Sequence, residues 1–161
     1  MLFRSIENSG VAHYLEHMNF KGTKNRTREQ LEADIESVGG QLNAYTSREN
    51  TSYSMTVFKN DAHKAIDIIG DMLTNSLYSE NQVEAERESV LRECIEVHKD
   101  QYESTIENAH YTAFRDHMMG QPRKGIRENY HTITRDQIVD FHKSNYLGKN
   151  LVVVATGDVN H

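Results

Sequence analysis

The stretch Gly10-Val-Ala-His-Tyr-Leu-Glu-His-Met-Asn-Phe20 contains two histidines, at positions 13 and 17, and a glutamate at position 16. Its apolar residues recur at helical spacing and Gly22 follows as a stop signal, so we expect a short helix from residue 9 or 10 to residue 20. On such a helix, His13 and His17 lie on one face, with Glu16 beside them. The stretch therefore places three chemically active side chains close together.

The pattern His-x-x-Glu-His, formed by His13, Glu16 and His17, is typical of one class of zinc peptidase. Both imidazoles can reach a metal ion at about 2.0–2.1 Å, and Glu16 suits a general base that acts on water. The alternative is that two histidines share a helix surface by chance. A zinc site needs a third protein ligand from elsewhere in the chain.

A second expected helix carries carboxylates that can supply this ligand. The capping box Ser79-Glu-Asn-Gln82 predicts its start, and it extends to about Lys99. One stripe of this helix has three-four spacing and consists of Val83, Glu86, Val90, Glu93 and Val97. Carboxylates on an apolar stripe require a compensating cation, a hydrogen bond or solvent. Either a metal compensates Glu93, or both glutamates pair with basic neighbours at the rim of a solvated helix.

Four further helices are each expected to begin at a polar capping residue, namely Thr27, Asn60, Ser104 and Thr134. The first of these ends at Gly39-Gly40 and the third runs to about Met119. Residues 157–161 are typical of the start of one more helix.

Three segments have the character of strands. Residues 41–46 and 51–58 alternate between apolar and polar side chains, which predicts an antiparallel pair. The continuous apolar run over residues 151–156 predicts a buried strand. We therefore expect an α+β fold in which an antiparallel sheet is covered by helices.

The composition sets the class of protein. The chain has 161 residues, of which 37% are hydrophobic and 26% charged, which fits one globular domain. Its net charge of −6 argues against a nucleic-acid partner, and no apolar stretch is long enough to span a membrane. Cys94 is the only cysteine, which excludes an internal disulfide. Residues 1–5 lack the features of a targeting segment, so we expect either none or one outside this chain.

Together, His13-Tyr-Leu-Glu-His17 and the later Glu86 and Glu93 resemble the pitrilysin-type metallopeptidase family. Three flanking segments are similar to the catalytic β subunits of one branch of that family, the mitochondrial processing peptidases. These segments are Ala12-His-Tyr-Leu-Glu-His-Met-Asn-Phe-Lys-Gly-Thr23, Leu42-Asn-Ala-Tyr-Thr-Ser-Arg-Glu49 and Val90-Leu-Arg-Glu93. The likeness covers essentially the whole chain, although Arg123 and Lys124 stand where the family has apolar residues.

The resemblance implies a role for each site residue. One Zn²⁺ per chain would be held by His13, His17 and Glu93, with Glu16 as the base and Glu86 as the carboxylate that orients the site. The strand over residues 42–46 would pair with an extended substrate. Its implied substrate-binding residues are Asn43, Ala44 and Tyr45.

The resemblance also implies a substrate, a partner and a location. The substrates would be the basic presequences of imported mitochondrial precursors, and the partner a separate α subunit in a heterodimer. The location would be the mitochondrial matrix or the inner membrane. Two alternatives are a core subunit of respiratory complex III, with or without peptidase activity, and a relative that degrades loose peptides.

The family's architecture leads to an expectation about the extent of the domain. Its members have two strands before the motif helix and a second homologous half after the first. We therefore expect residues 1–161 to be a single N-terminal metallopeptidase domain that is truncated at both ends and, in isolation, is an inactive fragment.

Overall fold

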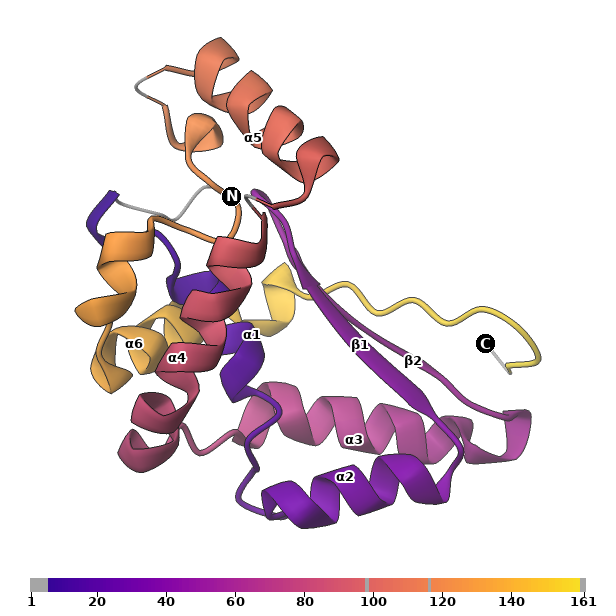
Figure 1. The fold of residues 1–161 in the computed structure, drawn as a ribbon. Helices are drawn as coiled ribbons and strands as arrows, with labels where there is room; N and C mark the ends of the chain where they lie inside the picture. Colours follow the sequence, from indigo (N-terminus) through magenta and orange to yellow (C-terminus); the bar gives the residue numbers. More distant parts are fainter. Residues whose placement is uncertain (1–5, 98, 116, 160–161) are drawn as a thin grey trace.

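The computed structural model describes residues 6–97, 99–115 and 117–159 (Figure 1). Its regular elements, in chain order, are α1 Val11–Met18, α2 Arg28–Ser37, β1 Gln41–Thr46, β2 Thr51–Thr56, α3 Ala62–Asn75, α4 Glu80–Val97, α5 Gln101–Ala113 and α6 Arg135–Asn145, joined by loops and short 3-10 turns. Residues 1–5, which lack the sequence features of a targeting segment, lie outside the described part. The α+β class is confirmed.

The hairpin of β1 and β2 forms the sheet of the described chain. Its antiparallel register runs from Gln41 opposite Thr56 to Thr46 opposite Thr51. In Figure 1 this hairpin crosses above α2 and α3, which form a layer beneath it. The layers meet in a small core of Leu31, Ile68 and Met72, packed against Phe20, Ile35, Leu42 and Met55. One face of the hairpin is thus covered by helices, as the alternation of its side chains predicts.

Helix α1 occupies the centre of a second, larger core. It packs against α4, α6 and β1, so that its residues are nearly surrounded. Its apolar residues Val11, Tyr14, Leu15 and Met18 are each at most 1% exposed. Val83 and Val90 of α4 and Ile138 of α6 belong to the same core. This packing fixes the motif helix against α4, which carries the two glutamates.

Local capping signals account for several helix starts. The expected capping boxes at Thr27 and Thr134 are both formed, each with the threonine hydroxyl and a glutamine side chain in reciprocal hydrogen bonds. The expected cap at Asn60 was wrong, because Asn60 lies within a 3-10 turn and α3 begins after it at Ala62, without a side-chain cap. An adjacent turn of 3-10 helix satisfies the backbone there instead.

The start and end of α5 also differ from the prediction. The helix begins at Gln101 because the carboxylate of Asp100 accepts a hydrogen bond from the Glu103 amide, three residues before the expected opening at Ser104. It ends at Ala113, and Met118–Gly120 forms a separate 3-10 turn. Aspartate is as good a capping residue as serine, so the earlier cap sets the boundary.

The predicted strand over residues 151–156 was wrong. These residues form no ladder with the described strands, and Val152 and Val153 are 87% and 86% exposed. An apolar, β-branched run favours an extended backbone, but a strand also requires the edge of a neighbouring strand to pair with. The helix expected from Gly157 is not seen up to Val159, and residues 160–161 lie outside the described part.

Within the described residues, no helix combines the length and the apolar character needed to cross a membrane.

Candidate metal centre

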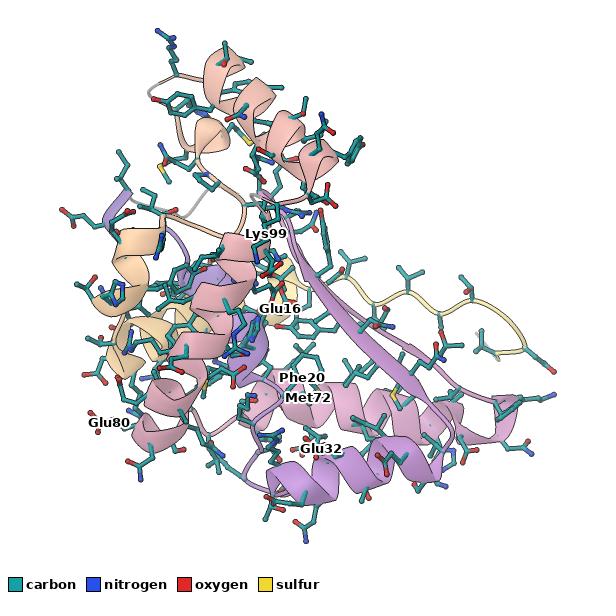
Figure 2. All side chains as sticks on the ribbon, viewed as in Figure 1. Glu16, Phe20, Glu32, Met72, Glu80 and Lys99 are labelled. Atoms are coloured by element: carbon teal, nitrogen blue, oxygen red, sulfur yellow. The ribbon has the colours of Figure 1, made fainter. Side chains whose placement is uncertain are left out.

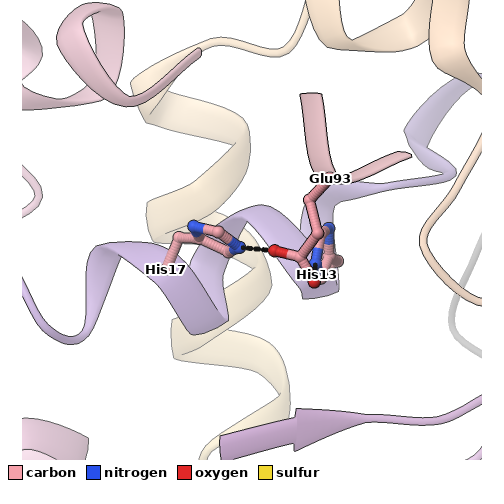
Figure 3. A group of neighbouring side chains, drawn as sticks. All are labelled: His13, His17 and Glu93. Carbon is pink, nitrogen blue, oxygen red and sulfur yellow. Dashed lines mark hydrogen bonds and ion pairs between the residues drawn. The ribbon is translucent and has the colours of Figure 1, made fainter. Parts of the chain in front are cut away.

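Helices α1 and α4 bring three possible metal ligands together. His13 and His17 lie one turn apart on α1, and Glu93 reaches them from α4 (Figure 3). One ligand atom from each residue lies within 4.8 Å of the other two. The predicted stripe of α4 faces α1, because Val83 and Val90 are buried in the same core as the apolar residues of α1. Glu86 and Glu93 of the same stripe both contact His17. The expectation that both glutamates share this face is therefore confirmed.

His17 makes two contacts with carboxylates from α4. Its Nδ1 lies 2.9 Å from Oε1 of Glu86, and its Nε2 lies 2.9 Å from Oε2 of Glu93. Burial alone would lower the pKa of His17, but the hydrogen bonds to Glu93 and Glu86 outweigh burial, and the net shift is upward. The Glu86 contact holds the Nδ1 proton, so the Nε2 atom can bind either a proton or a metal ion.

His13 has a different environment. Its Nδ1 lies 3.0 Å from the hydroxyl of Tyr130, and that hydroxyl donates its proton to the backbone carbonyl of Lys124. The Tyr130 oxygen must therefore accept the proton of Nδ1, which assigns the lone pair of His13 to Nε2. This Nε2 is buried and has no hydrogen-bond partner among the described residues; Oε1 of Glu93 is 3.5 Å away.

Protonation of His13 is opposed by its surroundings. Burial lowers the pKa of His13 below its ordinary value, although the Glu93 carboxylate acts in the other direction. A neutral imidazole with a lone pair that is not engaged in a hydrogen bond is the form that binds metals. Two imidazole nitrogens and one carboxylate oxygen, with a buried nitrogen left without a partner, fit the ligand set of a catalytic zinc site.

Glu16 lies beside this ligand group without belonging to it. It is half-buried on α1, and Oε2 of its carboxylate accepts a hydrogen bond from the hydroxyl of Thr46, at the end of β1. Figure 2 shows Glu16 between the motif helix and the hairpin. Its carboxylate is therefore held between the ligand group and the edge strand.

Glu86 contacts a ligand rather than completing the ligand group. It binds Nδ1 of His17 and forms an ion pair with Lys21, whose Nζ is 2.5 Å from Oε2. Burial would raise the pKa of Glu86, but Lys21 and His17 lower it by more. An ionised carboxylate in this position fixes the orientation of the His17 ring.

The residues expected to bind substrate lie on β1, next to α1. Asn43 and Tyr45 are exposed and Ala44 is half-buried opposite Tyr53 of β2. In the described part of the chain, β1 pairs with β2 along one edge and with no other strand. The hydroxyl of Tyr45 accepts a hydrogen bond from Arg123 at 2.9 Å.

Several functional contacts were not anticipated from the sequence. Tyr130 and Lys124 reach the site from the segment between α5 and α6, and Thr46 reaches Glu16 from β1. Tyr130 is 117 residues from His13 along the chain, so no local pattern connects the two. Of these residues, only Lys124 had an unusual sequence feature, because the family that the chain resembles has an apolar residue at this position.

Comparison with known proteins shows which family the chain is similar to. A family model described as Insulinase (Peptidase family M16) matches residues 4–125. The mitochondrial-processing peptidase subunit beta of Neurospora crassa is 44% identical over 155 residues, which is 96% of this chain and 33% of the relative. The subunit of that name in Saccharomyces cerevisiae is 40% identical over 98% of this chain and 34% of its own length. The one in Homo sapiens is also 40% identical, over 99% of this chain and 32% of its own length. The chain thus spans about a third of the length of these relatives.

Solved structures show the same fold. A protease from Helicobacter pylori superposes with a TM-score of 0.83 at 25% identity, over 92% of this chain and 36% of that protein. The periplasmic protease PqqL from Escherichia coli gives a TM-score of 0.79, also at 25% identity, over 92% of this chain and 17% of its own. With the family match over most of its length, and with these relatives, the chain belongs to the insulinase family, peptidase family M16.

Proposed function

We propose that this chain supplies the zinc-binding part of a metalloendopeptidase that removes N-terminal presequences from mitochondrial precursor proteins. The observation that carries the proposal is the convergence of His13, His17 and Glu93 around a buried histidine nitrogen that has no hydrogen-bond partner among the described residues. Peptidases of family M16 are zinc metallopeptidases, which supports one Zn²⁺ bound by these three side chains. The choice of presequences as substrates is supported by the names of the relatives.

A different neighbour fixes the orientation of each of the three proposed ligands. His13 is oriented by Tyr130, His17 by Glu86, and Glu93 by its position on α4 opposite both rings. A zinc ion in this site would polarise the scissile peptide carbonyl and make water a stronger acid. The fixed rings reduce the reorganisation that binding requires.

Glu16 is the proton carrier in this proposal. Its carboxylate takes a proton from the attacking water and returns it to the leaving amine. The hydroxyl of Thr46 holds one oxygen of Glu16 and leaves the other available for this transfer. Glu86 is a positioning residue, since it acts through His17.

Strand β1 would bind the substrate backbone. Its edge away from β2 offers backbone groups to an extended peptide, with the exposed side chains of Asn43 and Tyr45 beside it and Ala44 between them. The end of this strand contacts Glu16 through Thr46, so a peptide added to β1 would pass close to the base. Such pairing reads the backbone and tolerates the varied sequences of presequences.

The partner and the location are inferred from the relatives. Their names describe β subunits of a mitochondrial processing peptidase, so we infer a heterodimer with an α subunit. The same names support a mitochondrial location, in the matrix or at the inner membrane. The net charge of −6 is compatible with a basic substrate.

Replacing the base tests the proposal. In the complete protein with its partner subunit, Glu16→Gln should reduce cleavage of a presequence-bearing precursor by at least about 100-fold and keep about one zinc per chain. Glu36→Gln, at an exposed position of α2, is the matched control and should cleave normally. Normal cleavage by Glu16→Gln would remove Glu16 as the base. Equal cleavage of random short peptides by the unmodified protein would instead indicate a peptide-degrading enzyme.

A further inference from the structure

Lys124 places a positive charge directly on the proposed metal ligand Glu93. Its Nζ lies 2.5 Å from Oε1 of Glu93, while Oε2 of the same carboxylate faces His17 at 2.9 Å. The Lys124 side chain is 20% exposed and that of Glu93 is 42% exposed, so water screens this contact only in part. Glu93 is therefore shared between an ammonium group and the two imidazoles.

The backbone around Lys124 is fixed against the motif helix. Gly125 has a φ of +94°, and a Cβ added there would lie 2.2 Å from the Cα of Gly10, at the start of α1. The hydroxyl of Tyr130 donates to the Lys124 carbonyl and also contacts His13. The reach of Lys124 to Glu93 is thus set by the fold, unlike that of a lysine on a free surface loop.

The basic residue next to Lys124 is engaged elsewhere. Arg123 forms ion pairs with Glu103 at 2.5 Å and with Glu107 at 3.6 Å, both on α5. Glu107 also pairs with Arg48 at 2.5 Å. Arg123 is thus engaged with α5, whereas Lys124 is directed into the ligand group. The two neighbouring basic residues therefore contact different acidic side chains.

We propose that Lys124 is a built-in counter-ion of Glu93, which neutralises this ligand in the metal-free protein and weakens zinc binding at the same site. The proposal rests on the zinc site of the proposed function. A zinc ion bound between His13, His17 and Glu93 would lie within a few ångströms of the ammonium group, where like charges repel in a partly buried site. The ammonium group also offsets the negative charge of the Glu93 carboxylate, which would otherwise attract the metal ion.

Repulsion should outweigh any help that Lys124 gives in positioning Glu93. The carboxylate is already placed by α4 and by its contact with His17, so it stays near the rings when Lys124 is removed. The repulsion, by contrast, disappears completely with the charge. Removing the charge should therefore tighten zinc binding.

The test compares three variants of the complete protein. Lys124→Met keeps the length of the side chain and removes the charge, whereas Lys124→Arg keeps the charge. Lys99→Met is the matched control, because it removes an exposed lysine that pairs with Glu96 on the surface. The zinc dissociation constant is measured by competition with a chromophoric chelator, and the melting temperature is measured with and without zinc.

Lys124→Met should bind zinc about tenfold more tightly than the unmodified protein, with a larger rise in melting temperature on zinc addition. Lys124→Arg and Lys99→Met should stay within about twofold of the unmodified protein. Equal or weaker zinc binding by Lys124→Met would overturn the inference and leave the proposed zinc site intact. The unmodified protein should bind zinc, and His13→Ala should abolish this binding. If either result is not obtained, both the zinc site and the inference about Lys124 are overturned.

Discussion

The candidate metal centre and the cluster around Asp71 both place a carboxylate among polar groups, but they neutralise it differently. Asp71, on α3, is buried and accepts hydrogen bonds from Thr23 and Asn25, each at 2.6 Å, and from Asn75 at 2.8 Å. It also pairs with Arg26 at 2.7 Å. Both carboxylate oxygens of Asp71 therefore have hydrogen-bond partners within the protein, and no external cation is needed.

The candidate metal centre is less complete. Glu93 has an ammonium and an imidazole as partners, yet the Nε2 atom of His13 beside it has no hydrogen-bond partner among the described residues. Buried polar atoms are normally satisfied, and an exception needs a reason. The comparison teaches that a carboxylate with all its hydrogen bonds made, such as Asp71, stabilises the fold. A group of possible ligands with an unsatisfied nitrogen is instead a candidate site for an external cation.

The largest expected effect is a loss of stability on replacement of Asp71, without a change in zinc binding. Asp71→Ala leaves the partly buried Arg26 without its most buried partner, which should cost about 3 kcal/mol of the free energy of unfolding. Zinc affinity should not change. Urea denaturation and a zinc titration on the same protein measure the two effects. Asp61→Ala, which breaks a surface pair with Lys64, should cost less than about 1 kcal/mol.

A change at Glu93 should give the opposite result. Glu93→Gln replaces an anionic ligand by a neutral amide, so zinc affinity should fall by at least about 100-fold, while the urea midpoint of the metal-free protein changes little. Elemental analysis after dialysis gives the zinc content. An unchanged zinc content would exclude Glu93 as a ligand. Glu86→Gln, which replaces the carboxylate that supports His17 and pairs with Lys21, should reduce affinity about tenfold.

Acid should weaken the Asp71 cluster in a defined range of pH. Burial alone would raise the pKa of Asp71, but hydrogen bonds from Thr23 and Arg26 outweigh it and lower the pKa from 3.8 to about 2. A carboxyl group with a depressed pKa stabilises the fold above its unfolded pKa and loses that effect as the pH falls through its folded pKa. The contribution, about 2 kcal/mol, is thus present above about pH 4 and gone below about pH 2.

Urea denaturation at a series of pH values measures this contribution. The difference in stability between the unmodified protein and Asp71→Asn should shrink steadily between pH 4 and pH 2. A difference that is independent of pH over this range would show that the charge of Asp71 is not what stabilises the cluster.

The smallest effects concern two helix caps, one near the Asp71 cluster and one near the candidate metal centre. Thr27 caps α2 beside the Asp71 cluster, and Thr134 caps α6, which packs on the motif helix. Replacement of either threonine by alanine should cost about 1 kcal/mol of stability and leave zinc affinity unchanged. A loss of zinc affinity in Thr134→Ala alone would indicate that the position of α6 controls the metal site.

Much of the fold and of the site could be predicted from the sequence because the signals are local. The capping boxes at Thr27 and Thr134 and the strand 41–46 all depend on residues a few positions apart. The same applies to the grouping of His13, Glu16 and His17. The predicted strand at 151–156 failed because pairing depends on a distant partner that composition does not reveal.

The sequence by itself determined which side chains share a helix face: the two histidines of α1, and Glu86 and Glu93 on the stripe of α4. Helical periodicity fixes such neighbours without reference to the rest of the chain. Only the tertiary structure decided that Tyr130 orients His13 and that Lys124 reaches Glu93. Those contacts arise because the buried core packs the segment before α6 against α1 and α4, and packing between distant segments has no period in the sequence.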